Sequence, residues 1–255
     1  MSKKIIIGNW KMNPPTAKEA EKLFKSILQF INYKLKTEAV ICPPVIYLDQ
    51  LTKIRTSKIK LGAQDASFHE EGPFTGEISA EMLYNLGARY VILGHSERRA
   101  LGETNEIINK KIKTSLSAGL VVILAVGENA RDASHSYFNL VKTQLEECLN
   151  GVKKTFISKI IVAYEPVWAI SSTPNHQDAT AADSREMAIF IRKVLSLKFG
   201  LEANGTRVIY GGSVNEKDAL DFLKNGGVDG LLSGRASLNA EKFAEIVKIC
   251  EVLNK

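Results

Sequence analysis

Eight short apolar segments recur along the 255 residues, and each is followed by a stretch with helical periodicity. Most of these segments are apolar at nearly every position, as expected of strands that are covered on both faces. They are Lys4 to Gly8, Ala39 to Cys42, Ile59 to Ala63, Tyr90 to Leu93, Val121 to Val126, Ile160 to Tyr164, Arg207 to Tyr210 and Gly230 to Leu232. The pattern favours parallel strands connected by helices.

The intervening segments carry helix signals of their own. Thr16 with Glu19 and Thr180 with Asp183 have the spacing of a capping box ahead of an apolar stripe. Strand followed by helix, eight times and without a long linker, predicts the α/β class and a (β/α)8 barrel in which residues 1–255 form a single domain. An open, doubly wound sheet remains the alternative, because periodicity does not show whether a sheet closes.

Charge and composition limit the classes of partner and the cellular location that we expect. The net charge of +6 favours anionic partners, but the lysine clusters lack interleaved aromatic residues, so small phosphorylated molecules are expected and nucleic acid is not. Three widely spaced cysteines and four histidines without ligand spacing indicate a reducing, cytoplasmic location and no metal site. The apolar runs are too short for a signal peptide or a membrane span.

Polar residues follow five of the predicted strands. Chemistry in a barrel of this kind takes place at the carboxyl ends of the strands, so these residues are the candidates for function. They are Asn9 and Lys11 after the first strand, His95 after the fourth, Glu165 after the sixth, Gly211-Gly212-Ser213 after the seventh and Gly234-Arg235 after the eighth.

The last two of these turns favour binding of an anion. Adjacent glycine-bearing turns allow main-chain N–H groups to approach a phosphate, although each is also compatible with a plain tight turn. No nucleotide-binding glycine motif is present. Lys11 is suited to neutralising a phosphate or polarising a carbonyl, with a solvated lysine as the alternative. Asn9 would lie on the same side of an extended chain and bind an oxyanion, or else form a turn.

Glu165 and His95 are suited to removing a proton next to a carbonyl group. Apolar neighbours make the Glu165 carboxylate a better proton acceptor. An imidazole in front of a helix that begins at Ser96 is expected to stay neutral and to donate a hydrogen bond to a developing oxyanion. Glu97 is a rival base, but its more polar surroundings favour an ion pair with Lys11 or Arg98.

These residues lie in motifs by which the chain resembles the triosephosphate isomerase family over nearly its full length. The motifs are Gly8 to Asn13, Gly62 to Gln64, Phe74 to Ser79, Gly94 to Arg99, Ala163 to Ile170, Tyr210 to Val214 and Ala236 to Leu238. The resemblance implies a TIM barrel that interconverts dihydroxyacetone phosphate and D-glyceraldehyde 3-phosphate without a cofactor, with Glu165 as proton acceptor and His95 as electrophile.

The resemblance also implies the remaining contacts. Asn9 and Lys11 would bind the triose, and main-chain groups of four residues would hold its phosphate: Ser171, Ser213, Gly234 and Arg235. The loop from Gln64 to Ser79, with Thr75 near its tip, would form a homodimer.

Residues Ser171 to Thr180 depart from the Gly-rich family lid, whereas the hinge at Pro166 to Trp168 is unchanged. A barrel for a larger sugar phosphate and an inactive binding barrel remain alternatives.

Overall fold

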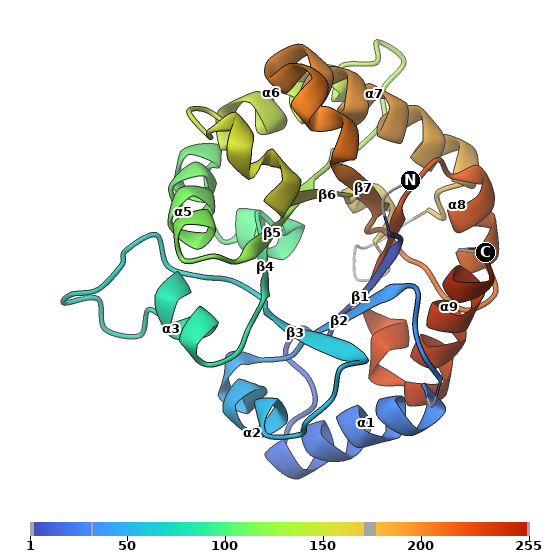
Figure 1. Ribbon diagram of the computed structural model, residues 1–255. Helices are drawn as coiled ribbons and strands as arrows, with labels where there is room; N and C mark the ends of the chain where they lie inside the picture. The colour runs from blue at the N-terminus through green and yellow to red at the C-terminus, as the bar shows by residue number, and fades with distance from the viewer. Residues whose placement is uncertain (1–2, 32, 171–176, 254–255) are drawn as a thin grey trace.

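The computed structural model describes residues 3–31, 33–170 and 177–253, and within them each strand pairs in parallel with the next. The strands are β1 (Ile5–Asn9), β2 (Glu38–Cys42), β3 (Ile59–Ala63), β4 (Tyr90–Leu93), β5 (Val121–Val126), β6 (Ile160–Tyr164), β7 (Arg207–Tyr210) and β8 (Gly230–Ser233). Strand β1 also pairs with β8, so the sheet closes into a barrel (Figure 1). The predicted barrel is confirmed.

Closure depends on close contact between the first and last strands. Ile5 lies opposite Gly230, and a Cβ atom at Gly230 would stand 1.8 Å from the Ile5 carbonyl oxygen. Only glycine therefore fits at the start of β8, because any side chain would push the two strands apart. The open-sheet alternative is wrong, since an open sheet would leave β1 and β8 unpaired.

Helices surround the barrel as an outer ring (Figure 1). They are α1 (Ala17–Phe30), α2 (Leu48–Thr52), α3 (Ala80–Asn85), α4 (Ser96–Ala100), α5 (Asn105–Ser117), α6 (Tyr137–Cys148), α7 (Ala181–Phe199), α8 (Ala219–Asn225) and α9 (Ala240–Leu253). Along β1, Ile5 and Ile7 belong to the cluster inside the barrel, whereas Ile6 packs in the larger cluster between the barrel and the helices. Both faces of each strand are buried, which explains the nearly continuous apolar runs.

The capping box predicted for α7 is confirmed in full, and that predicted for α1 is confirmed in part. Thr180 and Asp183 form the full capping box of α7, since the Thr180 side chain accepts the Asp183 N–H and the Asp183 carboxylate accepts the Thr180 N–H. At α1 the Thr16 hydroxyl accepts the Glu19 N–H. Each cap satisfies an N–H group that has no partner inside the helix.

A cluster of charges ties the amino ends of the strands together and makes stability depend on pH. Burial alone would raise the pKa of Glu38, but hydrogen bonds from Lys60 and Arg207 lower it from 4.5 to about 2. Because this pKa is lower in the folded state, the stabilisation is complete above the unfolded value and is lost as pH falls toward the folded value.

We therefore expect Glu38→Gln to lower the free energy of unfolding at pH 7 by about 1–2 kcal/mol and to flatten its pH dependence between about pH 5 and pH 2. Urea unfolding at several pH values measures both effects. Equal slopes for the two proteins across that range would show that Glu38 is not the group responsible.

Candidate active site

Glu165 lies directly beyond β6 at the carboxyl end of the barrel. Its N–H donates to the Val126 carbonyl at 2.8 Å, which continues the pairing of β6 with β5 by one residue. The side chain is only 2% exposed, and its Oε2 accepts the Ser96 N–H at 3.3 Å. Oε1 accepts no hydrogen bond from the described residues. A buried carboxylate with one free oxygen is a suitable acceptor for a proton from a ligand.

His95 faces this free oxygen. It is the N-cap of α4, as expected, and its Nδ1 accepts the Glu97 N–H at 3.2 Å. An acceptor at Nδ1 places the ring hydrogen on Nε2 and makes the imidazole neutral. Nε2 lies 3.5 Å from the Glu165 Oε1. The proposed base and the proposed hydrogen-bond donor thus point into one space from two different strands.

Lys11 occupies a strained position next to these groups. Its φ of 51° is in the left-handed region, which residues other than glycine rarely adopt outside functional sites. The Asn9 Oδ1 accepts the Lys11 N–H at 3.0 Å, and the Gln64 side chain donates to the Lys11 carbonyl at 2.8 Å. The Lys11 ammonium is paired with Glu97 at 2.5 Å. The expectation that Glu97 serves as an ion partner is confirmed.

The expectation that Asn9 and Lys11 share one side of an extended chain is wrong. Asn9 is the last residue of β1, and the chain turns immediately afterwards at Lys11. The hydrogen bond within this turn uses the Asn9 carboxamide oxygen, so the turn itself holds the amide in place. Both side chains nevertheless reach the same cavity.

The glycine-bearing turns form the opposite wall of that cavity. The cavity has a volume of about 400 Å³ and joins the groups from β1, β4 and β6 to the turns after β7 and β8. Among its lining residues are Asn9, Lys11, His95, Glu165, Gly211, Ser213, Gly234, Arg235, Glu216, Asn239 and Lys242. The five groups of strand-end residues predicted from the sequence therefore converge at one site.

The turn residues differ in which N–H and hydroxyl groups are available to bind an anion. The Ser213 N–H donates to the Ala169 carbonyl at 3.1 Å, while the Ser213 Oγ has no partner among the described residues. Arg235 begins a single 3₁₀ turn, Arg235–Leu238, whose first N–H groups have no acceptor within the turn. Ser171 and the lid residues up to 176 lie outside the described residues.

Gly211 leaves room for the Glu165 carboxylate. A Cβ atom at position 211 would stand 2.8 Å from the Glu165 Cγ. We expect Gly211→Ala to displace this carboxylate and to lower kcat by about 10-fold or more, because small misplacements of reacting groups are costly. Steady-state kinetics measure the effect. Gly205→Ala is the matched control, since nothing lies within 4 Å of a Cβ there, and an equal loss in both variants would contradict this role.

Two polar residues at strand ends are absent from the candidates predicted from the sequence. Gln64 follows β3 and holds the Lys11 carbonyl, and Glu128 follows β5 by two residues and is 1% exposed. The signal that found Glu165 would have found both of them, because each is a polar residue at the carboxyl end of an apolar run. Their roles are indirect, since they contact other protein groups.

A closed parallel barrel with a carboxylate, an imidazole and an ammonium group beside two glycine-bearing turns is typical of the class of phosphate-binding α/β-barrel enzymes. The triosephosphate isomerase family model matches residues 4–250. The triosephosphate isomerase of Aquifex aeolicus is 42% identical over 249 residues, which cover 96% of this chain and 98% of that protein. That of Dehalococcoides mccartyi is 44% identical over 253 residues, covering 98% and 97%.

Solved structures agree with these sequence relatives. A crystal structure of triosephosphate isomerase from Bartonella henselae has a TM-score of 0.85 at 37% identity and covers 99% of this chain and 100% of that one. The chain belongs to the triosephosphate isomerase family. It is an isomerase that interconverts triose phosphates, a step of glycolysis. Barrels for a larger sugar phosphate or without activity, the alternatives from the sequence, are set aside by this result.

Proposed function

We propose that Glu165 is the base of this isomerase and His95 its electrophile. The carboxylate removes a proton from the carbon next to the carbonyl of dihydroxyacetone phosphate. The C–H electron pair then forms the enediolate double bond, and negative charge moves to the carbonyl oxygen. The His95 Nε2–H donates to that oxygen, and the hydroxyl proton of carbon 1 passes to it by way of the His95 Nε2. The proton on Glu165 then adds to carbon 2 as the carbon 1 oxygen becomes the new carbonyl. The observation that carries this proposal is the free Glu165 Oε1 at 3.5 Å from the His95 Nε2.

The remaining lining residues bind the substrate in this proposal. Lys11 supplies positive charge beside the reacting oxygens while Glu97 holds its ammonium in place. Asn9 donates from its amide nitrogen, because its oxygen is already used by the Lys11 N–H. The phosphate binds to main-chain groups near Ser171, Gly234 and Arg235 and to the free Ser213 hydroxyl, because the Ser213 N–H already donates to the Ala169 carbonyl. Residues 1–255 act as one catalytic domain.

Hydrogen exchange with solvent tests the choice of base. In D₂O the wild-type protein is expected to introduce deuterium at carbon 1 of dihydroxyacetone phosphate, as followed by proton NMR. Glu165→Gln should abolish this exchange, whereas Glu97→Gln, the matched change at the rival carboxylate, should retain a measurable rate. Exchange that survives in Glu165→Gln and disappears in Glu97→Gln would reverse the assignment.

We further propose that the loop from Gln64 to Ser79 forms a homodimer contact. This cyan loop projects from the barrel beside α3 (Figure 1), and its base is fixed by the Ser67 N–H, which donates to the Ile78 carbonyl at 2.8 Å. A hollow of about 340 Å³ lies between the loop and Lys11. Met12 and Ile46, 93% and 76% exposed, adjoin residues that line it. Exposed apolar groups beside a hollow are typical of an interface between subunits.

Sedimentation velocity tests the dimer. The wild-type chain is expected to sediment at twice the monomer mass, and Thr75→Arg is expected to shift it toward the monomer by placing a charge at the loop tip. Lys53→Glu, an exposed change just after α2, serves as a control for altered charge. A monomeric wild type, or a dimer unaffected by Thr75→Arg, would contradict the proposed contact.

We propose a cytoplasmic location. Cys42, Cys148 and Cys250 are all free thiols buried in the structure, as expected of a protein kept in a reducing compartment. Among the described residues, no helix combines the length and the apolar character that crossing a membrane requires. Fractionation of cells that express the chain, with antibody detection, tests the location.

A further inference from the structure

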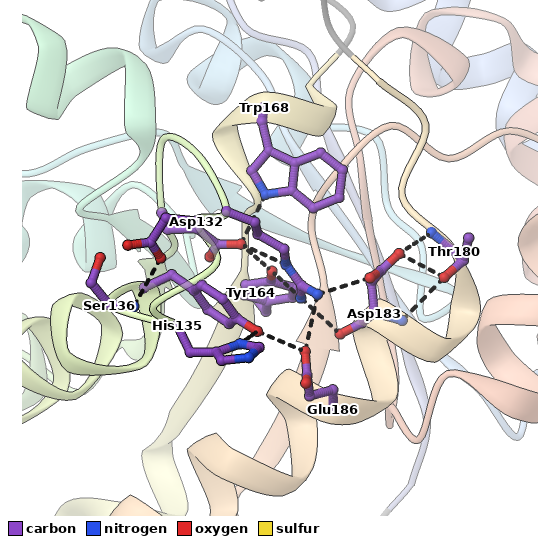
Figure 2. Close-up of polar contacts among 11 residues, drawn as sticks. Asp132, His135, Ser136, Tyr164, Trp168, Thr180, Asp183 and Glu186 are labelled. Atoms are coloured by element: carbon purple, nitrogen blue, oxygen red, sulfur yellow. Dashed lines mark hydrogen bonds and ion pairs between the residues drawn. The ribbon is translucent and has the colours of Figure 1, made fainter.

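Arg131 lies at the centre of a charged cluster that the proposed reaction does not use directly. Figure 2 shows Tyr164, Trp168, Asp183 and Glu186 converging on one point between strand β6 and helix α7. The Arg131 guanidinium contacts all four of these side chains. It donates to Asp183 at 2.8 Å, to Glu186 at 3.0 Å and to the Tyr164 hydroxyl at 3.3 Å. One side chain thus connects the end of β6 to the start of α7.

On the β6 side, the connection passes through Glu128. The Arg131 Nε lies 3.4 Å from the Glu128 Oε1, and this oxygen also accepts the Tyr164 hydroxyl at 2.7 Å and the Trp168 Nε1–H at 2.8 Å. The Glu128 carbonyl accepts the Val167 N–H at 2.9 Å. Glu128 therefore holds the chain both just before and just after Glu165. Arg131 thus places a positive charge beside this buried carboxylate, which offsets the cost of burying it.

On the α7 side, the connection passes through the capping box. The Asp183 Oδ1 and main-chain carbonyl both accept from Arg131, while the Asp183 Oδ2 accepts the Thr180 N–H at 2.8 Å. The Gln177 N–H donates to the Trp168 carbonyl at 2.9 Å. Arg131 and this hydrogen bond thus join the two described ends of the chain that flank residues 171–176.

The guanidinium is suited to this place in several ways. It lies over the rings of Tyr137 and Trp168, 4.8 and 5.5 Å from their centres. Burial alone lowers the pKa of Arg131, but its hydrogen bond to Tyr164 and the neighbouring acidic charges raise that pKa above its usual value. A lysine has a point charge and lacks the planar group that contacts acids and rings at the same time.

We propose that Arg131 is a positioning residue for the isomerase reaction, which acts through Glu128 and Trp168 to fix the segment that carries Glu165. The inference depends on the proposed role of Glu165 as the base. Glu165 lies between two main-chain anchors, its own N–H on Val126 and the Val167 N–H on Glu128. The Glu128 carboxylate adds a side-chain link, since its Oε1 accepts from Tyr164 and Trp168 and lies 3.4 Å from the Arg131 Nε. Loss of the Arg131 contacts frees this side chain and so misplaces the Glu165 carboxylate without removing any group that contacts the substrate.

The test compares Arg131→Met, which removes the charge and the donors, with Arg131→Lys, which keeps the charge. Arg131→Met is expected to lower kcat by about 10- to 100-fold, the range for a slightly misplaced catalytic group, with KM changed by less than about 3-fold. Arg131→Lys is expected to recover part of kcat. Trp168 emission, obtained by subtracting the spectrum of Trp168→Phe, is expected to shift to longer wavelength in Arg131→Met because the ring gains contact with water.

Arg207→Met is the matched control at the opposite end of the barrel. Arg207 is also largely buried and paired, with Glu38 at 2.7 Å, so its loss reports the effect of reduced stability alone. Its kcat should stay within about 2-fold of the wild type, as expected of a residue remote from the chemistry. If Arg131→Met lowers kcat no more than Arg207→Met, or raises only KM, the positioning role is overturned.

Two further outcomes are distinguishable. If Arg131→Met does not fold, Arg131→Lys carries the test: a kcat below wild type with unchanged KM supports the role, and an unchanged kcat overturns it. If Glu165→Asp retains full kcat, the proposed base is wrong whatever Arg131 does. If Glu165→Asp loses activity while both Arg131 variants keep it, only the positioning role is wrong.

Discussion

Replacing Glu165 by aspartate is expected to lower kcat by about 10²-fold or more with a small change in KM. The shorter side chain withdraws the carboxylate by one methylene, and a displacement of about 1 Å costs this much when groups must meet in a fixed geometry. The space around Glu165 leaves little room for adjustment, because the side chain is 2% exposed and packs on Gly211. A coupled isomerase assay measures kcat and KM.

Glu97→Asp is the control for this prediction. Glu97 is a carboxylate in the neighbouring helix, 48% exposed and paired with Lys11, so shortening it disturbs an ion pair at the edge of the site. Its effect should be smaller than that of Glu165→Asp by at least about 10-fold in kcat, because ion pairs near solvent contribute little. Similar kcat values for wild type and Glu165→Asp would exclude Glu165 as the base.

His95→Asn is expected to lower kcat by about 10²- to 10³-fold, the usual cost of removing one donor to an oxyanion. The asparagine oxygen replaces the Nδ1 atom that accepts the Glu97 N–H, so α4 keeps its cap. No atom of asparagine replaces the Nε2–H that lies 3.5 Å from Glu165. The variant therefore separates the helix cap from the hydrogen bond that we propose for catalysis.

His95→Gln makes the complementary change. The glutamine amide nitrogen reaches the position of Nε2, so kcat should fall less than in His95→Asn, while the helix cap is weakened. Thermal unfolding and steady-state kinetics of the two variants together measure both roles. If glutamine harms kcat more than asparagine does, the role of His95 lies in capping α4 rather than in donating a hydrogen bond from Nε2.

The sequence was sufficient to predict the order of strands and helices and the polar residues that stand at strand ends. Strands buried on both faces are apolar at nearly every position, and β3 to β7 begin and end where the apolar runs do. Strand β1 was displaced by one residue, because Asn9 still pairs with Cys42 although its side chain is polar. Polarity alone does not show where main-chain pairing stops.

The residues that support the site through other residues could not be predicted from the sequence. Arg131 lies in the segment after β5 among other polar residues, and nothing in its neighbourhood distinguishes it from a solvated charge. Apart from Glu128 and Tyr137, its partners are 33 to 55 residues away in the chain. The left-handed backbone at Lys11 could not be predicted either, since contacts with Asn9 and Gln64 impose it rather than any local preference of lysine.

The sequence by itself determined the alternation of strands and helices and which polar residues stand at strand ends, because burial on two faces and the lengths of the segments are local properties. Only the tertiary structure decided that the sheet closes, that His95 faces Glu165, and that Arg131 joins the end of β6 to the start of α7. These features depend on contacts between segments far apart in the chain, and side-chain geometry across such distances is set by packing of the whole barrel.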